Sequence, residues 1–299
     1  MSILVVGSIA YDTVETPYGS AQDSPGGSAL YFSAAASLFS PVNVVGVVGS
    51  DFDASKISFL KKRGVNLEGL YVESGDTFRW GGRYHRDLNK RDTLFTYLNV
   101  FEDFQPVIPE QYKDSKYIFL ANIAPDLQLQ VLEQIHKPKL VILDTMNFWI
   151  SGKRDTLEEV FKHSDIVILN DEEVREFTNE YNLLHAIDKI HNLGPKAVVI
   201  KKGEHGAILH FEDKFFFAPA YPLDKVVDPT GAGDSFAGGF VGYIAKENKI
   251  TDGILRKAVV YGSSVASYNV EDFSFNALIN LDMDKIQQRF DEFKGMTQI

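Results

Sequence analysis

Residues 226–240, Val-Val-Asp-Pro-Thr-Gly-Ala-Gly-Asp-Ser-Phe-Ala-Gly-Gly-Phe, combine acidic side chains with a glycine-rich turn. A short apolar run ends at Asp228, and the proline after it keeps Asp228 out of the helical conformation. Gly231 and Gly233 permit backbone geometry that other residues avoid. A helical pattern then begins near Gly233. A glycine loop that leads into a helix presents N–H groups and the positive end of the helix dipole, which bind anions such as phosphate. Asp234 in the first helical turn would face the same space.

A simpler interpretation of this stretch is that Thr230 or Asp234 only caps the helix and that the glycines only form a turn. Two other phosphate-binding motifs, the P-loop and the dinucleotide fingerprint, do not match this chain. The P-loop spacing is absent, because Gly152-Lys153 is followed by Arg154. A dinucleotide fingerprint would follow the first strand, whereas this glycine pair lies late in the chain and the next glycine comes at a longer gap. The two flanking aspartates and a further glycine pair, which allows close helix packing, favour an anion site.

Short apolar runs rich in Val and Ile predict strands that are buried on both faces, as in a parallel sheet. They cover residues 3–6, 42–48, 117–121, 140–143, 166–169 and 197–200. Helical patterns lie between them, at residues 28–39, 54–63, 127–136, 171–177 and 183–193. This alternation predicts an α/β fold, a doubly wound, mostly parallel sheet with helices on both faces. From Gly233 onward the pattern is mostly helical.

Residues 71–105 interrupt this rhythm. Residues 71–73, 77–83 and 93–99 alternate apolar and polar positions with glycines between them, which predicts a half-exposed antiparallel ribbon. The aromatic side chains of this ribbon could stack on a ligand, or could form its own small core or a contact between two copies of the chain; they are Phe78, Trp80, Tyr84, Phe95 and Tyr97.

The composition is that of a globular protein. The 299 residues are 44% hydrophobic and include no cysteine, which excludes disulfides, Cys-ligated zinc and thiolate nucleophiles. The net charge of −11 argues against binding to nucleic acid or to an anionic membrane. The first residues lack a basic targeting region, and the uncharged residues 24–50 contain two prolines and four glycines, which disfavours a spanning helix. We therefore expect a cytoplasmic protein.

The stretch Asp-Pro-Thr-Gly-Ala-Gly-Asp-Ser-Phe-Ala-Gly-Gly-Phe at 228–240 resembles the C-terminal signature of the ribokinase-like (PfkB) carbohydrate kinases. The glycine pair at 26–27 before an Ala-rich helix resembles the N-terminal signature, as does Val-Gly-Val-Val-Gly-Ser-Asp-Phe at 45–52 with the later Gly64-Val65. The resemblance covers essentially the whole chain. It implies ATP-dependent phosphorylation of a hydroxyl on a sugar, nucleoside or related small molecule, with Mg²⁺ and a monovalent cation as candidate cofactors.

The resemblance also implies a fold and a set of roles. One ribokinase-like domain would span residues 1–299, with a small antiparallel β lid contributed by about 11–25 and 71–105, and a homodimer through the lid is a candidate assembly. Asp234 would be the catalytic base, and Gly231, Ala232 and Gly233 the anion hole. Asn170 and Glu173 would organise Mg²⁺ and phosphate indirectly, although Asn followed three residues later by Glu is also a helix-capping pair.

Further residues are implied on the nucleotide side: Lys202, Gly203, Gly206, Asp228, Thr230, Ser263, Ser267 and Asn269. The loop at 201–206 could equally be a hairpin turn with solvated lysines, and the small residues at 263–267 could be helix packing. On the acceptor side the candidates are Asp12, Gly26, Gly27, Ser28 and Asn122. A carboxylate near a strand's carboxyl end is well placed to bind hydroxyls, although Asp12 could also be a solvated turn residue.

Two positions depart from the sugar-kinase pattern. Ser28 stands where many sugar kinases have Asn after the glycine pair, and residues 144–149 read Asp-Thr-Met-Asn-Phe-Trp where many have Asp-Pro-Asn-x-Arg. Both changes argue against plain ribokinase specificity. Two other functions compete with a kinase: a non-catalytic nucleotide- or sugar-binding regulatory protein on the same fold, and a nicotinamide-dependent oxidoreductase. The intact Asp234 favours the kinase.

Overall fold

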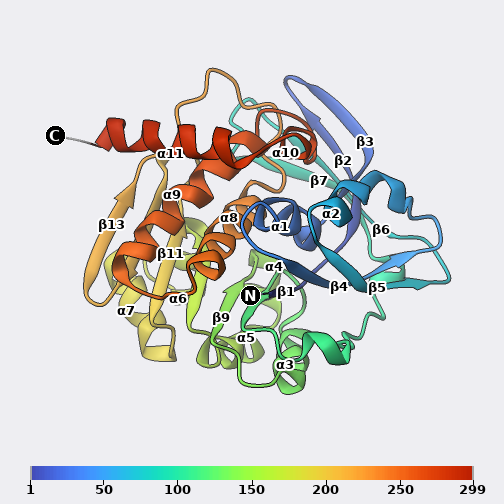
Figure 1. The fold of residues 1–299 in the computed structure, drawn as a ribbon, viewed down its shortest axis with the longest axis horizontal. Helices are drawn as coiled ribbons and strands as arrows, with labels where there is room; N and C mark the ends of the chain where they lie inside the picture. The colour runs from blue at the N-terminus through green and yellow to red at the C-terminus, as the bar shows by residue number, and fades with distance from the viewer. Residues whose placement is uncertain (1, 298–299) are drawn as a thin grey trace.

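The computed structural model describes residues 2–297, and its framework is a sheet of nine strands (Figure 1). Seven neighbouring strands run parallel and the last two, β12 and β13, form an antiparallel hairpin at one edge. The order across the sheet is β13 (Lys214–Ala218), β12 (Ala207–Phe211), β11 (Ala197–Lys201), β10 (Ile166–Asn170), β9 (Leu140–Asp144), β8 (Tyr117–Leu120), β1 (Ile3–Val6), β4 (Val42–Gly49) and β5 (Asn66–Glu73).

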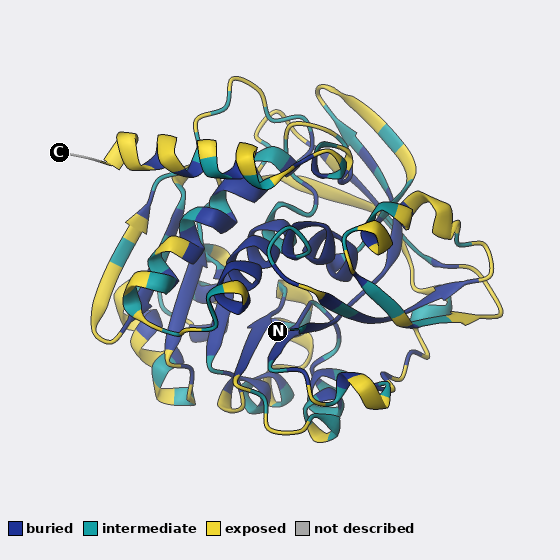
Figure 2. Ribbon diagram, viewed as in Figure 1, coloured by how far each residue is buried: buried dark blue, intermediate teal, exposed yellow. Residues whose placement is uncertain are grey.

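Helices cover both faces of this sheet, because successive strand residues point to opposite sides. Ile3 and Val5 of β1 enter one apolar cluster, and Leu4 and Val6 enter the other. The central strands and the helices against them are accordingly buried in Figure 2. The first face carries α1 (Ser28–Ala36), α2 (Ser58–Lys62), α8 (Ala232–Glu247), α9 (Asp252–Asn269), α10 (Asn276–Ile279) and α11 (Met283–Thr297). The second carries α3 (Pro125–Gln134), α4 (Asn147–Gly152), α5 (Arg154–Lys162), α6 (Asp171–Thr178) and α7 (Leu183–Leu193).

Helix α8 packs unusually close to its two neighbours. A Cβ on Gly238 would lie 2.4 Å from the Phe32 carbonyl oxygen of α1, and one on Gly239 would lie 3.0 Å from the backbone of Gly262 in α9. The predicted role of this glycine pair in helix packing is confirmed. This close packing fixes the start of α8, where the glycine loop lies.

A second, smaller sheet contains β3 (Gly19–Gly26), β2 (Ala10–Thr16), β6 (Phe78–Tyr84) and β7 (Arg91–Tyr97), in that order. Its β2–β3 and β6–β7 pairs are antiparallel, and the middle pair β2–β6 is parallel. Residues 71–73 are not part of it: they end β5, which pairs in parallel with β4. The sequence pattern was ambiguous there because β5 is an edge strand with one exposed face, so it alternates like a ribbon.

The predicted fold class is confirmed, and α7 spans the predicted residues 183–193. The β12–β13 hairpin was not predicted. Its two-residue turn is formed by Glu212 and Asp213, both with positive φ (49° and 57°), which is typical of a tight hairpin turn. Within residues 2–297, four 3₁₀ turns complete the elements: η1 (Ala54–Ile57), η2 (Asn99–Phe101), η3 (Glu110–Tyr112) and η4 (Gly203–His205).

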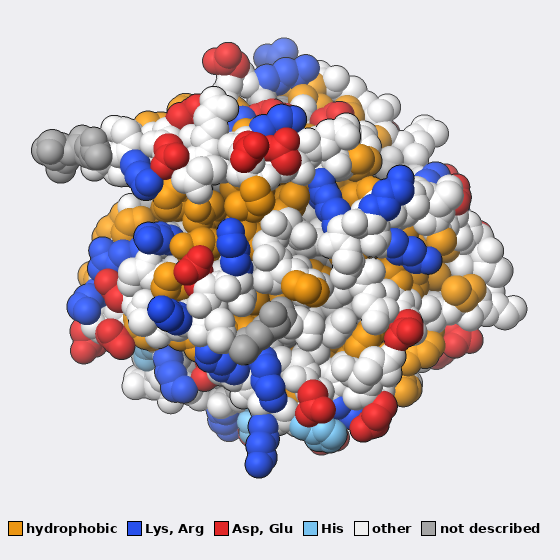
Figure 3. All heavy atoms as spheres, viewed as in Figure 1, with side chains coloured by type: hydrophobic (Ala, Val, Ile, Leu, Met, Phe, Trp, Pro, Cys, Tyr) orange, Lys and Arg blue, Asp and Glu red, His pale blue; other side chains and the backbone are white. Residues whose placement is uncertain are grey.

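The surface carries charges of both signs. On the face drawn in Figure 3, Lys and Arg side chains are interspersed with Asp and Glu, and apolar side chains gather in a band beneath α11. Between residues 2 and 297, no helix combines the length and apolar character needed to cross a membrane.

Candidate active site

Three neighbouring strands of the large sheet end in polar or charged residues. β9 ends at Asp144, β10 at Asn170 and β11 at Lys201, and parallel strands present these ends at one edge. The Lys201 Nζ lies 3.4 Å from both carboxylate oxygens of Asp144, and both side chains are largely buried. Neither residue is among the predicted site residues, although Lys201 begins the predicted nucleotide-side loop at 201–206. The available signal was a charged residue at the end of an apolar strand.

The glycine loop and the start of α8 face this ion pair. Gly231 is the N-cap of α8 with φ 73°, and no side chain caps the helix. The interpretation of Thr230 or Asp234 as a simple N-cap is therefore wrong. A Cβ on Gly233 would lie 3.0 Å from the Lys201 Nζ, so the ammonium group points at the helix N-terminus. Gly233 itself does not have positive φ, contrary to expectation, because it is already the second residue of the helix.

Two buried residues hold the loop in place. Asp228 accepts hydrogen bonds from the Thr230 N–H (2.8 Å) and the Ser274 N–H (3.2 Å). Asn269 donates from its amide nitrogen to the Thr230 carbonyl oxygen (2.9 Å) and accepts from the Ser235 hydroxyl (3.1 Å). The structure thus gives Asp228 and Asn269, both predicted on the nucleotide side, contacts that brace the anion loop.

The pKa of Asp234 is well above the ordinary value for an aspartate. Burial, together with the nearby Asp144, raises its pKa to about 7, and Lys201 opposes the rise. A helix N-terminus on its own favours the ionised form of a carboxyl group and would keep its pKa low. At Asp234, desolvation and a second carboxylate outweigh this effect of the dipole. A group with a pKa near 7 can hold or release a proton under physiological conditions, which is what a general base requires.

Lys201 supplies the positive charge of the cluster. Burial works against its charge, but Asp144, Glu173 and Asp234 together raise the pKa of its ammonium group above the usual value. The side chain is therefore a permanent cation between three carboxylates and the helix N-terminus. Such a cation can bind the phosphate oxygens of a nucleotide.

Asn170 and Glu173 form a complete capping box at the start of α6. The Glu173 N–H donates to the Asn170 side-chain oxygen (2.8 Å), and the Asn170 N–H donates to Glu173 Oε2 (2.7 Å). The capping interpretation is confirmed. Burial is the main cause that raises the pKa of Glu173 to about 7; Asp144 contributes to this rise and Lys201 opposes it. A magnesium role for this pair stays a prediction.

Glu173→Gln separates these two roles. The amide oxygen retains the bond from the Asn170 N–H, and the variant no longer has to ionise a buried carboxyl. Because the raised pKa means that ionisation destabilises the fold above about pH 4.5, the melting temperature should be equal or higher at pH 8, and this difference should disappear at acidic pH. Phosphoryl transfer should fall and require more Mg²⁺. Unchanged Mg²⁺ dependence would leave Glu173 as a cap alone.

On the acceptor side, Asp12, Gly26 and Gly27 lie together. Asp12 is 5% exposed on β2, and a Cβ on Gly26 would lie 1.9 Å from its Oδ2. Burial, together with the nearby Asp228, raises the pKa of Asp12 to about 7. Gly27 has φ 91° and begins α1. A solvated turn aspartate is excluded, and a buried carboxyl of this kind is suited to hydrogen-bond hydroxyl groups.

Two other acceptor-side candidates already have partners within the protein. The Ser28 hydroxyl lies 3.1 Å from the Ser8 N–H and from the Ser8 hydroxyl. Asn122 accepts a hydrogen bond from the Trp149 Nε1 (3.0 Å). Ser28 therefore connects the start of α1 to the residues that follow β1. Asn122 connects the end of β8 to α4.

The remaining nucleotide-side candidates lie in the loop between β11 and β12 and on α9. Gly203 and Gly206 have φ 52° and 88° in a tight connection of this antiparallel hairpin, so the predicted hairpin geometry is confirmed. Its lysines are not solvated, because the Lys201 and Lys202 side chains are only 18% and 25% exposed. The nucleotide-side role of the loop stays a prediction. The Lys202 Nζ lies 3.9 Å from Asp171, outside the carboxylate cluster. On α9, Ser267 donates to the Ser264 carbonyl and accepts from Arg289, whereas Ser263 is partly exposed.

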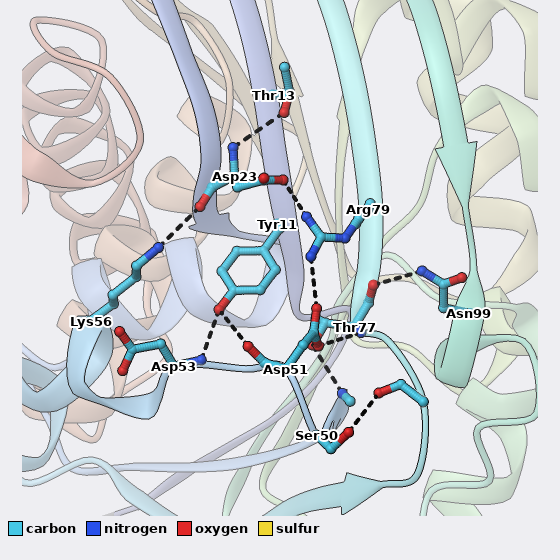
Figure 4. Close-up of polar contacts among 12 residues, drawn as sticks. Tyr11, Thr13, Asp23, Ser50, Asp51, Asp53, Lys56, Thr77, Arg79 and Asn99 are labelled. Atoms are coloured by element: carbon cyan, nitrogen blue, oxygen red, sulfur yellow. Dashed lines mark hydrogen bonds and ion pairs between the residues drawn. The ribbon is translucent and has the colours of Figure 1, made fainter.

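The small sheet is tied to the end of β4 by a polar network (Figure 4). Asp51 accepts from the Thr77 N–H (2.8 Å), the Thr77 hydroxyl (2.6 Å) and the Arg79 guanidinium (2.8 Å). Arg79 also pairs with Asp23 of β3 and lies over the Tyr11 ring. Tyr11 precedes Asp12, so this network sets the position of β2 above the large sheet. It accounts structurally for the Ser-Asp-Phe part of the stretch at 45–52.

Gly231→Ala tests the loop geometry. Gly231 has φ 73°, and a Cβ there would lie 2.2 Å from the Tyr31 ring, which is buried and cannot move aside freely. We expect a loss of about 1–3 kcal/mol of stability together with a larger fall in phosphoryl transfer than the stability loss explains. Thermal unfolding and initial rates measure the two effects. Gly253→Ala, where a Cβ meets open space, is the matched control; equal behaviour of both variants would contradict the assigned geometry.

The cluster of Lys201 with Asp144, Glu173 and Asp234 suits a nucleotide that binds as its Mg²⁺ complex. Over residues 2–297, no three His, Asp or Glu side chains are grouped to hold a metal on their own. Burial raises the pKa of Asp144, as it does that of Glu173, and a nearby divalent cation would favour their ionised forms. Oxygen ligands, with water and phosphate completing the shell, are those that Mg²⁺ prefers.

Comparisons with known proteins agree with this geometry. The family described as "pfkB family carbohydrate kinase" matches residues 1–279. A cytidine kinase from Thermococcus kodakarensis is 32% identical over 248 residues, covering 81% of this chain and 87% of that protein. The crystal structure of the Methanocaldococcus jannaschii nucleoside kinase superposes with a TM-score of 0.76 at 22% identity, covering 97% of this chain and 98% of that one.

A putative ribokinase II from E. coli, in complex with ATP and Mg²⁺, superposes with a TM-score of 0.80 at 19% identity and covers 97% of this chain and 99% of that one. Kinases of this family use ATP and Mg²⁺ and transfer a phosphoryl group to a hydroxyl. The chain belongs to the pfkB family of carbohydrate kinases and is a phosphotransferase that acts on an alcohol group.

Proposed function

We propose that this protein is an ATP- and Mg²⁺-dependent nucleoside kinase that phosphorylates a ribose hydroxyl, with Asp234 as general base. The observation that carries the proposal is the position of Asp234. Its carboxyl stands in the first turn of α8, within electrostatic reach of both the Lys201 cation and the acceptor-side Asp12, and the pKa of about 7 suits proton transfer. A donor phosphate at the helix N-terminus and an acceptor hydroxyl at Asp12 would meet at this residue.

A nucleoside acceptor is supported over a simple sugar by three observations. The relatives described above include a cytidine kinase and a nucleoside kinase. Residues 144–149 and Ser28 depart from the sugar-kinase pattern. Trp80 pairs with Asp12 across β6 and β2, so the indole shares the face of the small sheet that carries Asp12 and can offer a stacking surface for a base.

The proposed reaction uses each group in one role. Asp12 hydrogen-bonds acceptor hydroxyls and sets their distance from the donor. The N–H groups at the start of α8 and the Lys201 ammonium stabilise negative charge on the transferring phosphoryl group. Mg²⁺, when bound with ATP, neutralises phosphate charge. Asp234 takes the proton of the attacking hydroxyl as its oxygen bonds to phosphorus. The small sheet lies over the acceptor and limits access of water.

Acceptor screening tests this proposal. The protein is incubated with MgATP and a panel of ribonucleosides, deoxyribonucleosides, ribose and other free sugars, and ADP release is measured. We expect acceptor-dependent ADP release with at least one ribonucleoside and far less with free ribose. Turnover of sugars with no response to nucleosides would contradict the acceptor class. Nucleotide binding without turnover of any acceptor would favour the regulatory alternative.

The lid assignment of about 11–25 and 71–105, dimerisation through the small sheet and a monovalent cation stay predictions from the family resemblance. Each is independent of the acceptor class. Slower hydrogen exchange in residues 78–97 on addition of an acceptor would support the lid, and equal exchange with and without a turned-over acceptor would oppose it.

A further inference from the structure

We propose that Arg91 of the small sheet is a catalytic residue that contacts the transferred phosphoryl group. The proposal rests on the function proposed above and assigns a donor that the glycine loop and Lys201 do not supply. It is carried by the position of Arg91 between two contacts that join the small sheet to the nucleotide side of the site.

The first contact joins β6 to the anion loop. The Tyr84 hydroxyl is within 3.2 Å of the Thr230 hydroxyl, one residue before Gly231, and Tyr84 is 7% exposed. Arg91 pairs directly with Tyr84 across the β6–β7 ladder, so the two side chains share one face. The Arg91 guanidinium lies beside the Tyr84 hydroxyl, where it opposes the rise in the Tyr84 pKa caused by burial. Arg91 therefore lies on the face of the small sheet that is turned towards the anion loop.

The second contact joins the loop between β6 and β7 to the β11–β12 connection. A Cβ on Gly203 would lie 2.9 Å from the Asn89 side-chain oxygen. Asn89 precedes Arg91 by two residues, and Gly203 follows Lys201 by two. The small sheet thus reaches the large sheet on both sides of Arg91, at the anion loop and at the strand that carries Lys201.

Arg91 differs from most other cations of the small sheet and its connecting loop. Arg79 pairs with Asp23 and Asp51, Arg83 with Glu15, and His85 and Lys90 with neighbouring aspartates. Within residues 2–297, Arg91 makes no ion pair. Its guanidinium stacks over the Trp80 ring, 5.2 Å from the centroid, which orients the planar group without neutralising it. Its charge remains available for a ligand.

The charges facing Arg91 come from three elements. Arg91 lowers the pKa of Asp12 on β2, of Asp234 on α8 and of Glu173 on α6. None of these carboxylates is within ion-pair distance of it in the described chain, so Arg91 faces the space between them. Asp12 belongs to the proposed acceptor side and Glu173 to the nucleotide side. The phosphoryl group must cross this space on its way from donor to acceptor.

The chemistry of that group fits a guanidinium. During transfer, the acceptor oxygen forms a bond to the γ-phosphorus, the bond to the bridging oxygen of ADP breaks, and the acceptor proton passes to Asp234. Negative charge spreads over three equatorial oxygens. A planar fork of N–H donors binds two such oxygens at once. Arg91 gives and takes no proton; it stabilises the charge of the transition state.

Three variants test the proposal: Arg91→Ala, Arg91→Lys and, as a matched control, Arg83→Ala, whose guanidinium pairs with Glu15 and is 56% exposed. We expect Arg91→Ala to lower kcat by about 10²–10³, as the loss of one transition-state donor does elsewhere, with the acceptor KM changed only a few-fold. Arg91→Lys should restore less than a tenth of the lost rate, because a point charge replaces a fork. Added guanidinium should partly rescue Arg91→Ala but not Arg91→Lys. Arg83→Ala should retain nearly full kcat.

Other outcomes overturn the proposal. A kcat of Arg91→Ala within three-fold of the wild type, or equal to that of Arg83→Ala, contradicts it. Hydrogen exchange of residues 78–97 must still slow on acceptor binding in Arg91→Ala; if this protection is lost, Arg91 only fastens the small sheet. If no acceptor is turned over by the wild type, the proposed function fails by itself. In that case the role of Arg91 is tested by the slow hydrolysis of MgATP by water, whose rate Arg91→Ala should lower by a similar factor.

Discussion

Asp234→Asn is expected to lower kcat by about 10²–10⁴, equivalent to roughly 3–5 kcal/mol of transition-state stabilisation. Asparagine has nearly the same shape and keeps a polar oxygen at the helix N-terminus, but it cannot accept the hydroxyl proton. Affinity for MgATP should stay within a few-fold, because the phosphate contacts come from backbone N–H groups and Lys201. Single-turnover rates and nucleotide titrations measure the two quantities separately. Asp252→Asn, in the first turn of α9 and paired with Arg256, is the control and should leave kcat unchanged.

The pH profile gives a second test of the same residue. The base form of Asp234 is the ionised one and its pKa is about 7, so kcat/KM of the wild type should rise with pH through this region and level off in alkaline solution. Asp12 and Glu173 titrate near the same pH, which steepens the rise. In Asp234→Asn the rise should be shallower. A variant with near wild-type turnover and an unchanged profile would show that Asp234 is not the base.

Lys201→Met should have the second largest effect. The variant removes the buried cation that offsets Asp144, Glu173 and Asp234, so the pKa of each carboxyl rises further and the base is ionised only at higher pH. We expect kcat/KM at neutral pH to fall by at least about 10² and the midpoint of the pH profile to move upward by about one unit or more. Stability should fall as pH rises, because the folded state must then hold uncompensated carboxylates.

Two further variants isolate the charge effect. Lys202→Met removes a charge whose only carboxylate partner in the described chain is Asp171, at 3.9 Å, so the midpoint of the pH profile should stay in place. The double variant Asp144→Asn with Lys201→Met replaces an ion pair by neutral groups, which is often tolerated. It should recover most of the stability of the single variant without recovering activity. Equal pH midpoints in Lys201→Met and the wild type would contradict the assigned cluster.

Much of the large sheet follows from local pattern. Strands buried on both faces are continuous apolar runs, and each run in this chain is followed by a helical pattern, so β1, β8 and β9 could be located and the doubly wound arrangement predicted. Pairing partners were harder to predict. Residues 71–73 alternate as an exposed ribbon does, and only the contact with β4 makes them the edge of the large sheet. The β12–β13 hairpin lacks Gly and Pro at its turn and was missed for that reason.

The parts of the site that could be predicted are those where the local backbone conformation requires a particular residue type. The Gly231 turn and the Asn170–Glu173 cap are such cases, because glycine and capping residues act on their immediate neighbours. Lys201 and Lys202 are adjacent in the sequence, and only the register of β11 decides which of them enters the carboxylate cluster. The pKa of Asp234 depends on burial and on Asp144, which lies ninety residues away in the chain.

Phosphorus NMR of the reaction product tests the central claim most directly. The protein is incubated with MgATP and a ribonucleoside, starting with cytidine, and the spectrum is followed with time. The account predicts equal amounts of ADP and a nucleoside monophosphate, whose phosphorus is coupled to the protons of the ribose carbon that carries it, and neither product forms at a comparable rate with Asp234→Asn. Release of inorganic phosphate alone, or transfer that proceeds equally in Asp234→Asn, would contradict it.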